Sequence, residues 1–322
     1  MLITHFSLIR WINLSSVANI IESTMDSRRF ILQYLAATVI LGSLGIFAIQ
    51  TRLDAPTIVF YRCLFGAIAL GIYCLCAGDF RSISKRDLYV ALATGVLMVG
   101  NWVFFFEGIL RIGISVATIV YQVQPFAVLV AGALIFRERL GLTQILLFLT
   151  ALIGLVLATG VQWSRVDKEY LTGFGVTMTA AILYAGVVLT GKSLKSIRPT
   201  AVTFIQCVVG VISLPIIDPF ILHTPIAAHR VAWLAGLGVI HTALVYALIY
   251  GALPKLNSSV IAIMTFIYPA SAILFDFLVN RKILSVSQFL GLAIIVFSST
   301  GITCGWKLPQ LGKRLESVCQ VY

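Results

Sequence analysis

Two stretches of 30 residues decide the fold: SVATIVYQVQPFAVLVAGALIFRERLGLTQ, residues 115–144, and SVIAIMTFIYPASAILFDFLVNRKILSVSQ, residues 259–288. They lie 144 residues apart and align without gaps, with eight of the 30 positions identical. At the same offset, residues 57–70 align with residues 201–214, and five of these 14 positions are identical. A single ungapped offset that serves several segments predicts an internal repeat.

The composition around these stretches is strongly apolar. Of 322 residues, 60% are hydrophobic and 11% are charged, whereas soluble proteins carry about 25% charged residues. This excludes a cytosolic enzyme, a disordered chain and a nucleic-acid-binding domain. The net charge of +11 is then expected to reflect basic cytoplasmic loops. The six cysteines lie mostly in apolar runs, so we interpret them as packing residues and not as a disulfide framework or metal site.

Apolar runs of about 20 residues, the length that crosses the hydrocarbon core as a helix, recur along the chain. Barrel strands would instead alternate apolar and polar residues over about 10 positions, and the long apolar runs do not alternate. We therefore predict an all-α integral membrane protein with ten transmembrane helices. These span residues 30–49, 55–77, 87–110, 113–136, 141–162, 172–191, 200–222, 230–253, 257–279 and 284–306.

Five predicted helices fall in each half of the chain, in residues 30–162 and 172–306. An odd number per half places the halves in opposite orientations and predicts an inverted 5+5 repeat, which favours transport over an enzyme or a simple anchor. Residues 1–29 are expected to form a cytoplasmic leader. It could be a helix on the membrane surface, but we favour a disordered or misassigned start, with Met25 as the true one. Residues 307–322 are expected to form a cytoplasmic tail.

Lysine and arginine indicate the orientation, because they concentrate in cytoplasmic loops. If the N-terminus is cytoplasmic, the inner segments hold 15 of the 23 basic residues and the outer segments and span edges hold seven, with Arg62 inside a span. Both termini are therefore predicted to be cytoplasmic.

Short motifs accompany the repeat in a fixed order. They are Leu41-Gly42-Ser43, Phe60-Tyr61-Arg62, Asn101-Trp102, Gln124-Pro125 and Arg137-Glu138-Arg139-Leu140 in the first half, and Tyr184, Tyr268-Pro269 and the stretch from Gly291 to Gly301 in the second. By their order, spacing and duplication, residues 30–306 resemble the EamA family of the drug/metabolite transporter superfamily.

The resemblance implies ten helices around a central cavity, a bacterial inner-membrane location and export of small metabolites, often amino acids or related compounds. Two positions depart from the family pattern. Leu41 stands where the family often has tryptophan, and Lys282 stands where it often has an acidic residue. These departures weaken any transfer of a subfamily's substrate.

Pro125 and Pro269 are equivalent in the repeat and fall near the middle of their predicted spans. Proline removes a backbone donor and frees a carbonyl one turn earlier, and in lipid that carbonyl needs a partner or a wet cavity. We expect a kink beside a midplane site that serves as a hinge for alternating access. A simple packing kink is the alternative.

Polar side chains in the third, fourth, eighth and ninth predicted helices are candidates for substrate binding. Amide and phenol groups donate and accept hydrogen bonds and suit a polar uncharged or zwitterionic substrate, and a histidine could also accept a proton. The alternative is hydrogen bonding between helices. The candidates are Asn101, Tyr121, Gln122, Gln124, His241, Tyr246 and Tyr268.

Three charged residues lie inside predicted spans: Arg62, Glu107 and Asp276. A charge at the bilayer centre costs about 2.5–3.5 kcal/mol on insertion scales. Arg62 is deep enough to need a partner, and a pair with Glu107 could form an outer gate or a proton-coupling site. Snorkelling to the interface is the alternative, and we expect it for Asp276.

The sequence therefore predicts a secondary transporter that exports small organic metabolites by alternating access, with possible proton coupling and contact with membrane lipid. The chain has no Walker motif and no metal-ligand spacing, so no cofactor, no metal and no enzymatic activity are expected, and no nucleic acid is expected as a partner. The alternatives are a drug or nucleotide-sugar carrier and a non-transporting membrane protein.

Overall fold

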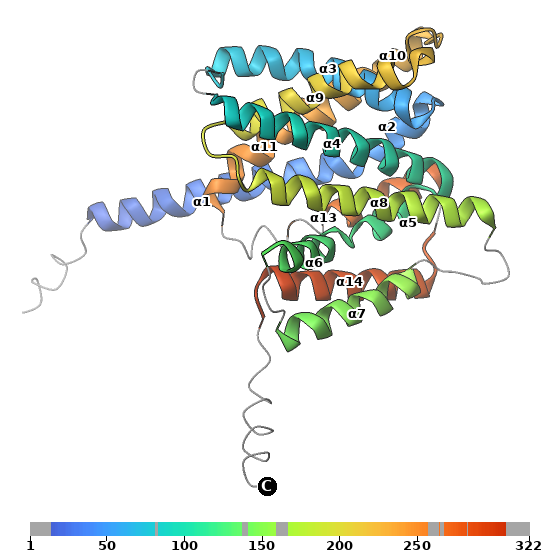
Figure 1. Ribbon diagram of the computed structural model, residues 1–322. Coiled ribbons are helices and arrows are strands. Elements are labelled where there is room, and N and C mark those ends of the chain that lie inside the picture. The colour runs from blue at the N-terminus through green and yellow to red at the C-terminus, as the bar shows by residue number, and fades with distance from the viewer. Residues whose placement is uncertain are drawn as a thin grey trace, which may run out of the picture.

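Every element of the described chain is a helix, which confirms the predicted fold class at this level (Figure 1). The computed structural model describes residues 14–80, 83–136, 141–158, 167–256, 264, 267–281 and 283–306. In chain order the elements are α1 (Leu14–Gly42), α2 (Leu44–Thr51), α3 (Ala55–Ala77), α4 (Lys85–Ile112), α5 (Ile114–Tyr121), α6 (Gln124–Phe136), α7 (Leu142–Ala158), α8 (Lys168–Gly191), α9 (Pro199–Ile217), the 3-10 helix η3 (Pro219–Leu222), α10 (Ala228–Gly238), the π-helix η4 (Val239–Leu244), α11 (Val245–Ala252), the 3-10 helix η5 (Leu253–Lys255), α13 (Ile267–Asn280) and α14 (Val286–Thr303).

Seven helical stretches of the described chain are long and apolar enough to cross a membrane. They are Arg28–Thr51, Ala55–Ala77, Lys85–Ile112, Ile114–Gly132, Lys168–Gly191, Pro199–Ile217 and Ala228–Ala252. Three further apolar helices, Leu142–Leu157, Ile267–Asn280 and Val286–Ser298, are shorter. The chain is thus a multi-pass membrane protein, while ten crossings in an inverted repeat stay a prediction.

The helix starts follow from local side-chain chemistry. The carboxylate of Asp54 accepts a hydrogen bond from the backbone N of Thr57 at the start of α3, and Asp167 does the same for Tyr170 in α8. Such caps satisfy backbone donors that the first helical turn leaves free. At the other end of α3, Gly78 takes the left-handed conformation, with φ 68°, which glycine adopts without steric cost.

Three predicted spans are interrupted, which the apolar pattern did not indicate. The first breaks at Ser43 between α1 and α2, where the Ser43 hydroxyl donates to the Ile40 carbonyl at 2.8 Å. The fourth breaks between α5 and α6, because Pro125 cannot donate to the carbonyl one turn earlier. The eighth contains the π-helix η4. Periodicity identifies apolar length, and these breaks depend on single side chains and tertiary contacts.

The predicted leader is partly helical. The helix α1 begins at Leu14, so a continuous helix runs from within residues 1–29 into the first apolar span. Residues 1–13, the predicted tail at 307–322 and the motif residues 137–140 lie outside the described part of the chain.

Helix packing pairs the two halves in a regular way. α3 packs on α9 and α7 packs on α14, and in each case the two helices occupy equivalent places in the repeat. α4 packs on α8, while α1 and α2 pack on α11 and α10. Likewise α6 packs on α8, and α13 packs on α1. Figure 1 shows α3 and α10 at one edge of the bundle and α7 and α14 at the opposite edge.

The crossing of α3 and α9 is built from equivalent small residues. A Cβ added to Gly210 would lie 2.5 Å from Sγ of Cys63, and one added to Gly66 would lie 3.3 Å from Sγ of Cys207. Both cysteines are fully buried. Each thiol thus fills the space opposite a glycine of the other half, which allows the two helices to approach closely.

Candidate functional site

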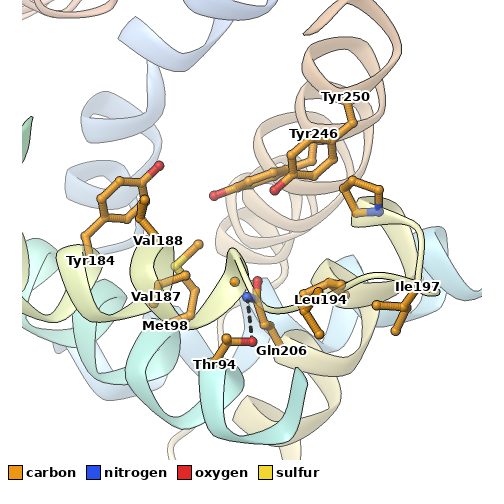
Figure 2. Close-up of a pocket in the computed structure, with 13 residues that line it drawn as sticks. Thr94, Met98, Tyr184, Val187, Val188, Leu194, Ile197, Gln206, Tyr246 and Tyr250 are labelled. Carbon is orange, nitrogen blue, oxygen red and sulfur yellow. Dashed lines mark hydrogen bonds between the residues drawn. The ribbon is translucent and has the colours of Figure 1, made fainter. Parts of the chain in front are cut away.

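A cavity of about 270 Å³ lies between α4, α8, α9 and α11. Figure 2 shows Tyr184 on one side of it, Tyr246 and Tyr250 on the other, and Gln206 beside Thr94. None of the described residues that line it is charged. Its walls therefore combine apolar surface with a few hydrogen-bonding groups, which is the usual character of a small-molecule site.

The orientation of the Gln206 amide is fixed by its neighbour. Nε2 of Gln206 donates to Oγ1 of Thr94 at 3.4 Å, and Oγ1 of Thr94 donates its own proton to the carbonyl of Ala91 at 2.8 Å. Because the Thr94 hydroxyl has only one proton, it can only accept from the amide. Oε1 of Gln206 is buried and has no partner among the described residues, and in Figure 2 it lies on the side of the tyrosines.

The α8–α9 link forms one end of the cavity and is held in place by two buried carboxylates. Leu194 and Ile197 of this link line the cavity. Asp87 of α4 accepts from the backbone N of Ser196 at 2.7 Å, and Asp79 accepts from Nη1 of Arg198 at 2.7 Å. Both carboxylates are more than nine-tenths buried. The cavity therefore reaches the end of the bundle where α8 ends and α9 begins, beside a well-anchored loop.

Tyr246 is the predicted binding residue that lines this cavity. Tyr121 lies one layer behind the wall, with its ring centroid 6.2 Å from that of Tyr184. Tyr268 of α13 packs against the same core cluster as Tyr184 and Tyr246. The predicted tyrosines thus gather around one region of the bundle interior from α5, α11 and α13.

Asn101 makes hydrogen bonds between helices, which was the alternative to substrate binding. Its Nδ2 donates to the hydroxyl of Tyr121 at 2.8 Å and to the carbonyl of Ala180 at 2.7 Å. These bonds connect α4 with α5 and α8, and they use both amide protons.

Gln122 and Gln124 lie at the α5–α6 break, and their Oε1 atoms are buried without a partner in the described chain.

His241 lies in the π-helix η4 and is fully buried. Its Nε2 is 2.9 Å from Oγ of Ser43, and its Nδ1 is 3.2 Å from the carbonyl oxygen of Gly236. π-helical turns inside longer helices often mark functional sites. Here the turn places the ring beside the break between α1 and α2.

The two predicted hinge prolines lie at helix starts. Pro125 is the second residue of α6, directly after the break, and Pro269 is the third residue of α13. Proline is well tolerated in a first helical turn, since its missing N–H has no helical partner there. At Pro125, the expected kink takes the form of a two-residue turn, Gln122 and Val123, between α5 and α6.

The structure does not form the suggested pair between Arg62 and Glu107. Glu107 binds Arg111 at 2.5 Å, and Arg111 also binds Glu169 of α8 at 2.6 Å. Arg62 faces Trp102, which lies about 140° around α4 from Glu107 at 100° per residue. Arg62 of α3 therefore contacts a different face of α4 from the one that carries Glu107.

Arg62 is held by neutral groups. Its Nε donates to Oγ1 of Thr242 at 2.8 Å, and its guanidinium carbon lies 4.4 Å from the ring centroid of Trp102 and 5.6 Å from that of Phe106. Only 2% of the residue is exposed. A desolvated guanidinium over an aromatic face gains about 2 kcal/mol or more, which offsets part of the cost of burying the charge.

The snorkelling expected for Asp276 is wrong. The residue is 1% exposed, and its Oδ2 accepts from the backbone N and the hydroxyl of Ser115 at 3.1 and 2.5 Å. Asn280 donates to Oδ1 at 2.8 Å. The carboxylate thus lies at the N-terminus of α5, where free backbone donors and the helix dipole stabilise a negative charge.

Sequence reasoning missed Gln206, although the repeat contained the signal. At the 144-residue offset Gln206 is the equivalent of Arg62, and both are strongly polar residues in mainly apolar helices.

Within the described residues, no cluster of three or more histidine, cysteine or carboxylate side chains is arranged for a metal ion.

The comparisons with known proteins agree on one family. The model of the EamA-like transporter family matches residues 28–160 and again residues 171–304. The uncharacterized transporter YxxF of Bacillus subtilis (strain 168) is 31% identical over 288 residues, which are 87% of this chain and 91% of that protein. An uncharacterized transporter of Archaeoglobus fulgidus is 22% identical over 271 residues, 84% of this chain and 94% of that protein.

A partial match and a solved structure complete the comparison. The uncharacterized inner membrane transporter YhbE of Escherichia coli (strain K12) is 28% identical over 109 residues, 33% of this chain and 34% of that protein. A crystal structure superposes with a TM-score of 0.58 over 90% of this chain and 99% of its own, at 15% identity, and supports the fold alone. From the double family match and the named relatives, this chain belongs to the EamA-like transporter family and is a membrane transporter.

Proposed function

We propose that the protein is a secondary transporter of small organic metabolites that works by alternating access between two states of an inverted ten-helix repeat. The observation that carries this proposal is a difference between two equivalent positions. A cavity lies beside Gln206, whereas at the equivalent place the guanidinium of Arg62 lies against two aromatic rings.

The equivalence extends to the neighbours of both residues. At the 144-residue offset, Tyr246 corresponds to Trp102 and Tyr250 to Phe106, and Met98 corresponds to Thr242. The first residue of each pair lines the cavity, and the second contacts Arg62. A transporter built from two inverted halves needs, in each end state, one half open to its side of the membrane and the other half closed. We infer that the side chains around Gln206 form the open group and those around Arg62 form the closed group.

The helix packing supports the inverted arrangement. Contacts of α4 with α8, and of α6 with α8, have counterparts in which every helix is replaced by its equivalent from the other half. An exchange of the two halves therefore maps the packing of the bundle onto itself. This is the property that lets one chain adopt two related conformations of similar free energy.

We place the protein in the cell inner membrane with both termini cytoplasmic, as the distribution of basic residues and the family resemblance imply. In that orientation the α8–α9 link is cytoplasmic, and the cavity reaches the cytoplasmic end of the bundle. A cavity that loads from the cytoplasm suits export. Amino acids or related compounds are the substrates that the resemblance implies.

A nucleotide-sugar carrier is the less favoured alternative. An anionic nucleotide needs cations around its phosphates, and none of the described residues that line the cavity is charged. A neutral drug-like molecule fits the lining better, so drug efflux remains the second candidate.

We further propose that transport is coupled to protons through His241. The Ser43 hydroxyl is within hydrogen-bond distance of both the Ile40 carbonyl and Nε2 of His241. When the ring is neutral with its proton on Nδ1, the hydroxyl can donate to Nε2. When the ring is charged, Nε2 donates to the hydroxyl, which then donates to Ile40. Rotation of one hydroxyl thus accommodates both protonation states.

The direct test uses purified protein in liposomes. Vesicles loaded with the twenty L-amino acids are given a pH gradient, and the release of each compound is measured by mass spectrometry. We expect release of a subset that rises with the gradient, and a Ser43→Ala variant that retains release but loses its pH dependence. Protein that releases none of the compounds under any gradient would contradict the proposed substrate class.

Glu107→Gln separates this coupling site from the outer ion pair. Because Glu107 is paired with Arg111 and lies away from the cavity, we expect the variant to keep its pH dependence. Loss of pH dependence in Glu107→Gln, with Ser43→Ala unaffected, would move the coupling role to the outer carboxylate.

A further inference from the structure

We propose that Oε1 of Gln206 is the specificity-determining acceptor of the cavity and selects ligands that carry an N–H donor and no net charge. The inference rests on the proposed function, because it names the chemistry that the transport cavity recognises. It concerns a residue that the family resemblance and the sequence pattern did not single out.

The first step is the free acceptor. Gln206 is 3% exposed, and its Oε1 has no hydrogen-bond partner in the described chain. A buried carbonyl oxygen without a partner costs about 1–3 kcal/mol, and native structures retain few such atoms. Gln206 lines the cavity, and a ligand or a water molecule that reaches Oε1 from there would satisfy it.

The second step fixes the polarity of this contact. Thr94 donates its hydroxyl proton to the carbonyl of Ala91, and in this arrangement the amide of Gln206 turns its nitrogen to Thr94 and its oxygen away from it. A flipped amide would place two acceptors against each other. The group offered to the ligand is therefore an acceptor, and the matching ligand group is a donor.

The third step concerns charge. The described lining holds no carboxylate and no basic side chain, so a ligand with net charge would lose its hydration without gaining a counter-charge from the lining itself. The hydroxyls of Tyr184, Tyr246 and Tyr250 lie around the same cavity (Figure 2) and can donate to a carboxylate or carbonyl. A zwitterion with its ammonium group at Gln206 and its carboxylate near the tyrosines satisfies both requirements.

The test compares three forms of one ligand. The probes are L-amino acids with a primary amine and an uncharged side chain, their N,N-dimethyl derivatives, which keep one N–H on the charged nitrogen, and their N,N,N-trimethyl derivatives, which keep the charge and have none. Binding to purified wild-type protein is measured by the ligand-induced shift of thermal unfolding over a concentration series. We expect binding to fall about tenfold or more, on the scale of one lost hydrogen bond to a buried acceptor, between the dimethyl and trimethyl forms.

The variant Gln206→Leu removes the acceptor from an apolar helix. It should weaken the binding of the N–H-bearing probes by about tenfold and leave the trimethyl probes unchanged, so that the three forms bind alike. Gln288→Leu is the matched control, because Gln288 caps the start of α14 through Ser285, away from the cavity. Thr94→Val frees the amide to turn and should reduce the preference for N–H without abolishing binding.

Each outcome decides the inference. A wild-type protein that loses as much affinity at the dimethyl step as at the trimethyl step responds to bulk and contradicts it. So does a Gln206→Leu variant that weakens all three forms equally, or wild-type protein that binds none of the probes. Amino acids that bind with the expected pattern but are not moved across liposomes would leave the inference standing and contradict the proposed function.

Discussion

The Arg62 side and the Gln206 side of the bundle occupy equivalent places in the repeat but are packed differently. On one side, a guanidinium lies between Trp102, Phe106 and Thr242. On the other, the equivalent side chains surround a cavity of about 270 Å³. The larger indole and the longer guanidinium fill one side, whereas a phenol and a shorter amide leave the other open. Similar backbone packing therefore surrounds a buried guanidinium on one side, which we call the sealed side, and a cavity on the other, which we call the open side.

The largest expected effect is the loss of stability when a side chain is added at a glycine that lies against the backbone of another helix. A Cβ added at Gly238, on the sealed side, would lie 2.6 Å from the backbone N of Gly66 and 2.8 Å from the backbone O of Arg62. We expect Gly238→Leu to lower the free energy of unfolding by about 3 kcal/mol or more, measured by denaturation in mixed micelles.

Gly191→Leu is the control on the open side. Gly191 lines the cavity, and no atom lies within 4 Å of a Cβ placed there. The free energy of unfolding of the Gly191→Leu variant should change by no more than about 0.5 kcal/mol. The added side chain should reduce the space for a ligand. Equal destabilisation by the two variants would remove the distinction between the two sides.

The middle-sized effect concerns the buried cation. Arg62→Met removes the contact with Trp102 and the hydrogen bond to Thr242, and we expect a loss of about 2 kcal/mol in the free energy of unfolding. The equivalent change Gln206→Met affects a side chain that faces open space, and its cost should be under about 1 kcal/mol. If Gln206→Met proves the more destabilising of the two, the Arg62 side does not carry the packing that we assign to it.

The repeat in the sequence correctly predicted an all-helical membrane protein and its family, because apolar length and duplicated motifs are one-dimensional signals. It did not indicate which helices break. Ser43 ends a helix because its hydroxyl finds the Ile40 carbonyl and, across the bundle, His241. Nor did it indicate that Asp276 is buried, since Ser115, whose backbone N and hydroxyl donate to this carboxylate, lies 161 positions earlier in the chain.

The sequence also left open which polar residues line the cavity and which join helices. Tyr246 lines the cavity, whereas Asn101 joins three helices through its hydrogen bonds, and composition cannot separate these two uses of a polar group. Gln206 was missed because an isolated glutamine in an apolar helix has no motif around it. Gln206 would have been identified if the residue equivalent to Arg62 in the second half had been compared with it.

The smallest expected effect is the loss of stability when one hydrogen bond of Arg62 is removed. Thr242→Val removes the hydroxyl that accepts from Nε of Arg62 at 2.8 Å and donates to the Leu237 carbonyl at 2.9 Å. The loss should be about 1 kcal/mol in the free energy of unfolding. The equivalent Met98→Val shortens a cavity-lining side chain, so it should enlarge the cavity and change stability less. A larger loss for Met98→Val would indicate that the open side is the better packed one.

Accessibility at one equivalent pair tests the central claim most directly. Met98→Cys and Thr242→Cys are each made in a chain whose native cysteines are replaced by serine or alanine, and reconstituted vesicles are treated with a membrane-impermeant maleimide from either side. We predict that the cysteine at 98 reacts from the side that holds the α8–α9 link and that the cysteine at 242 reacts from neither side without ligand. Equal reaction at the two positions, or reaction at 242 alone, would contradict the account.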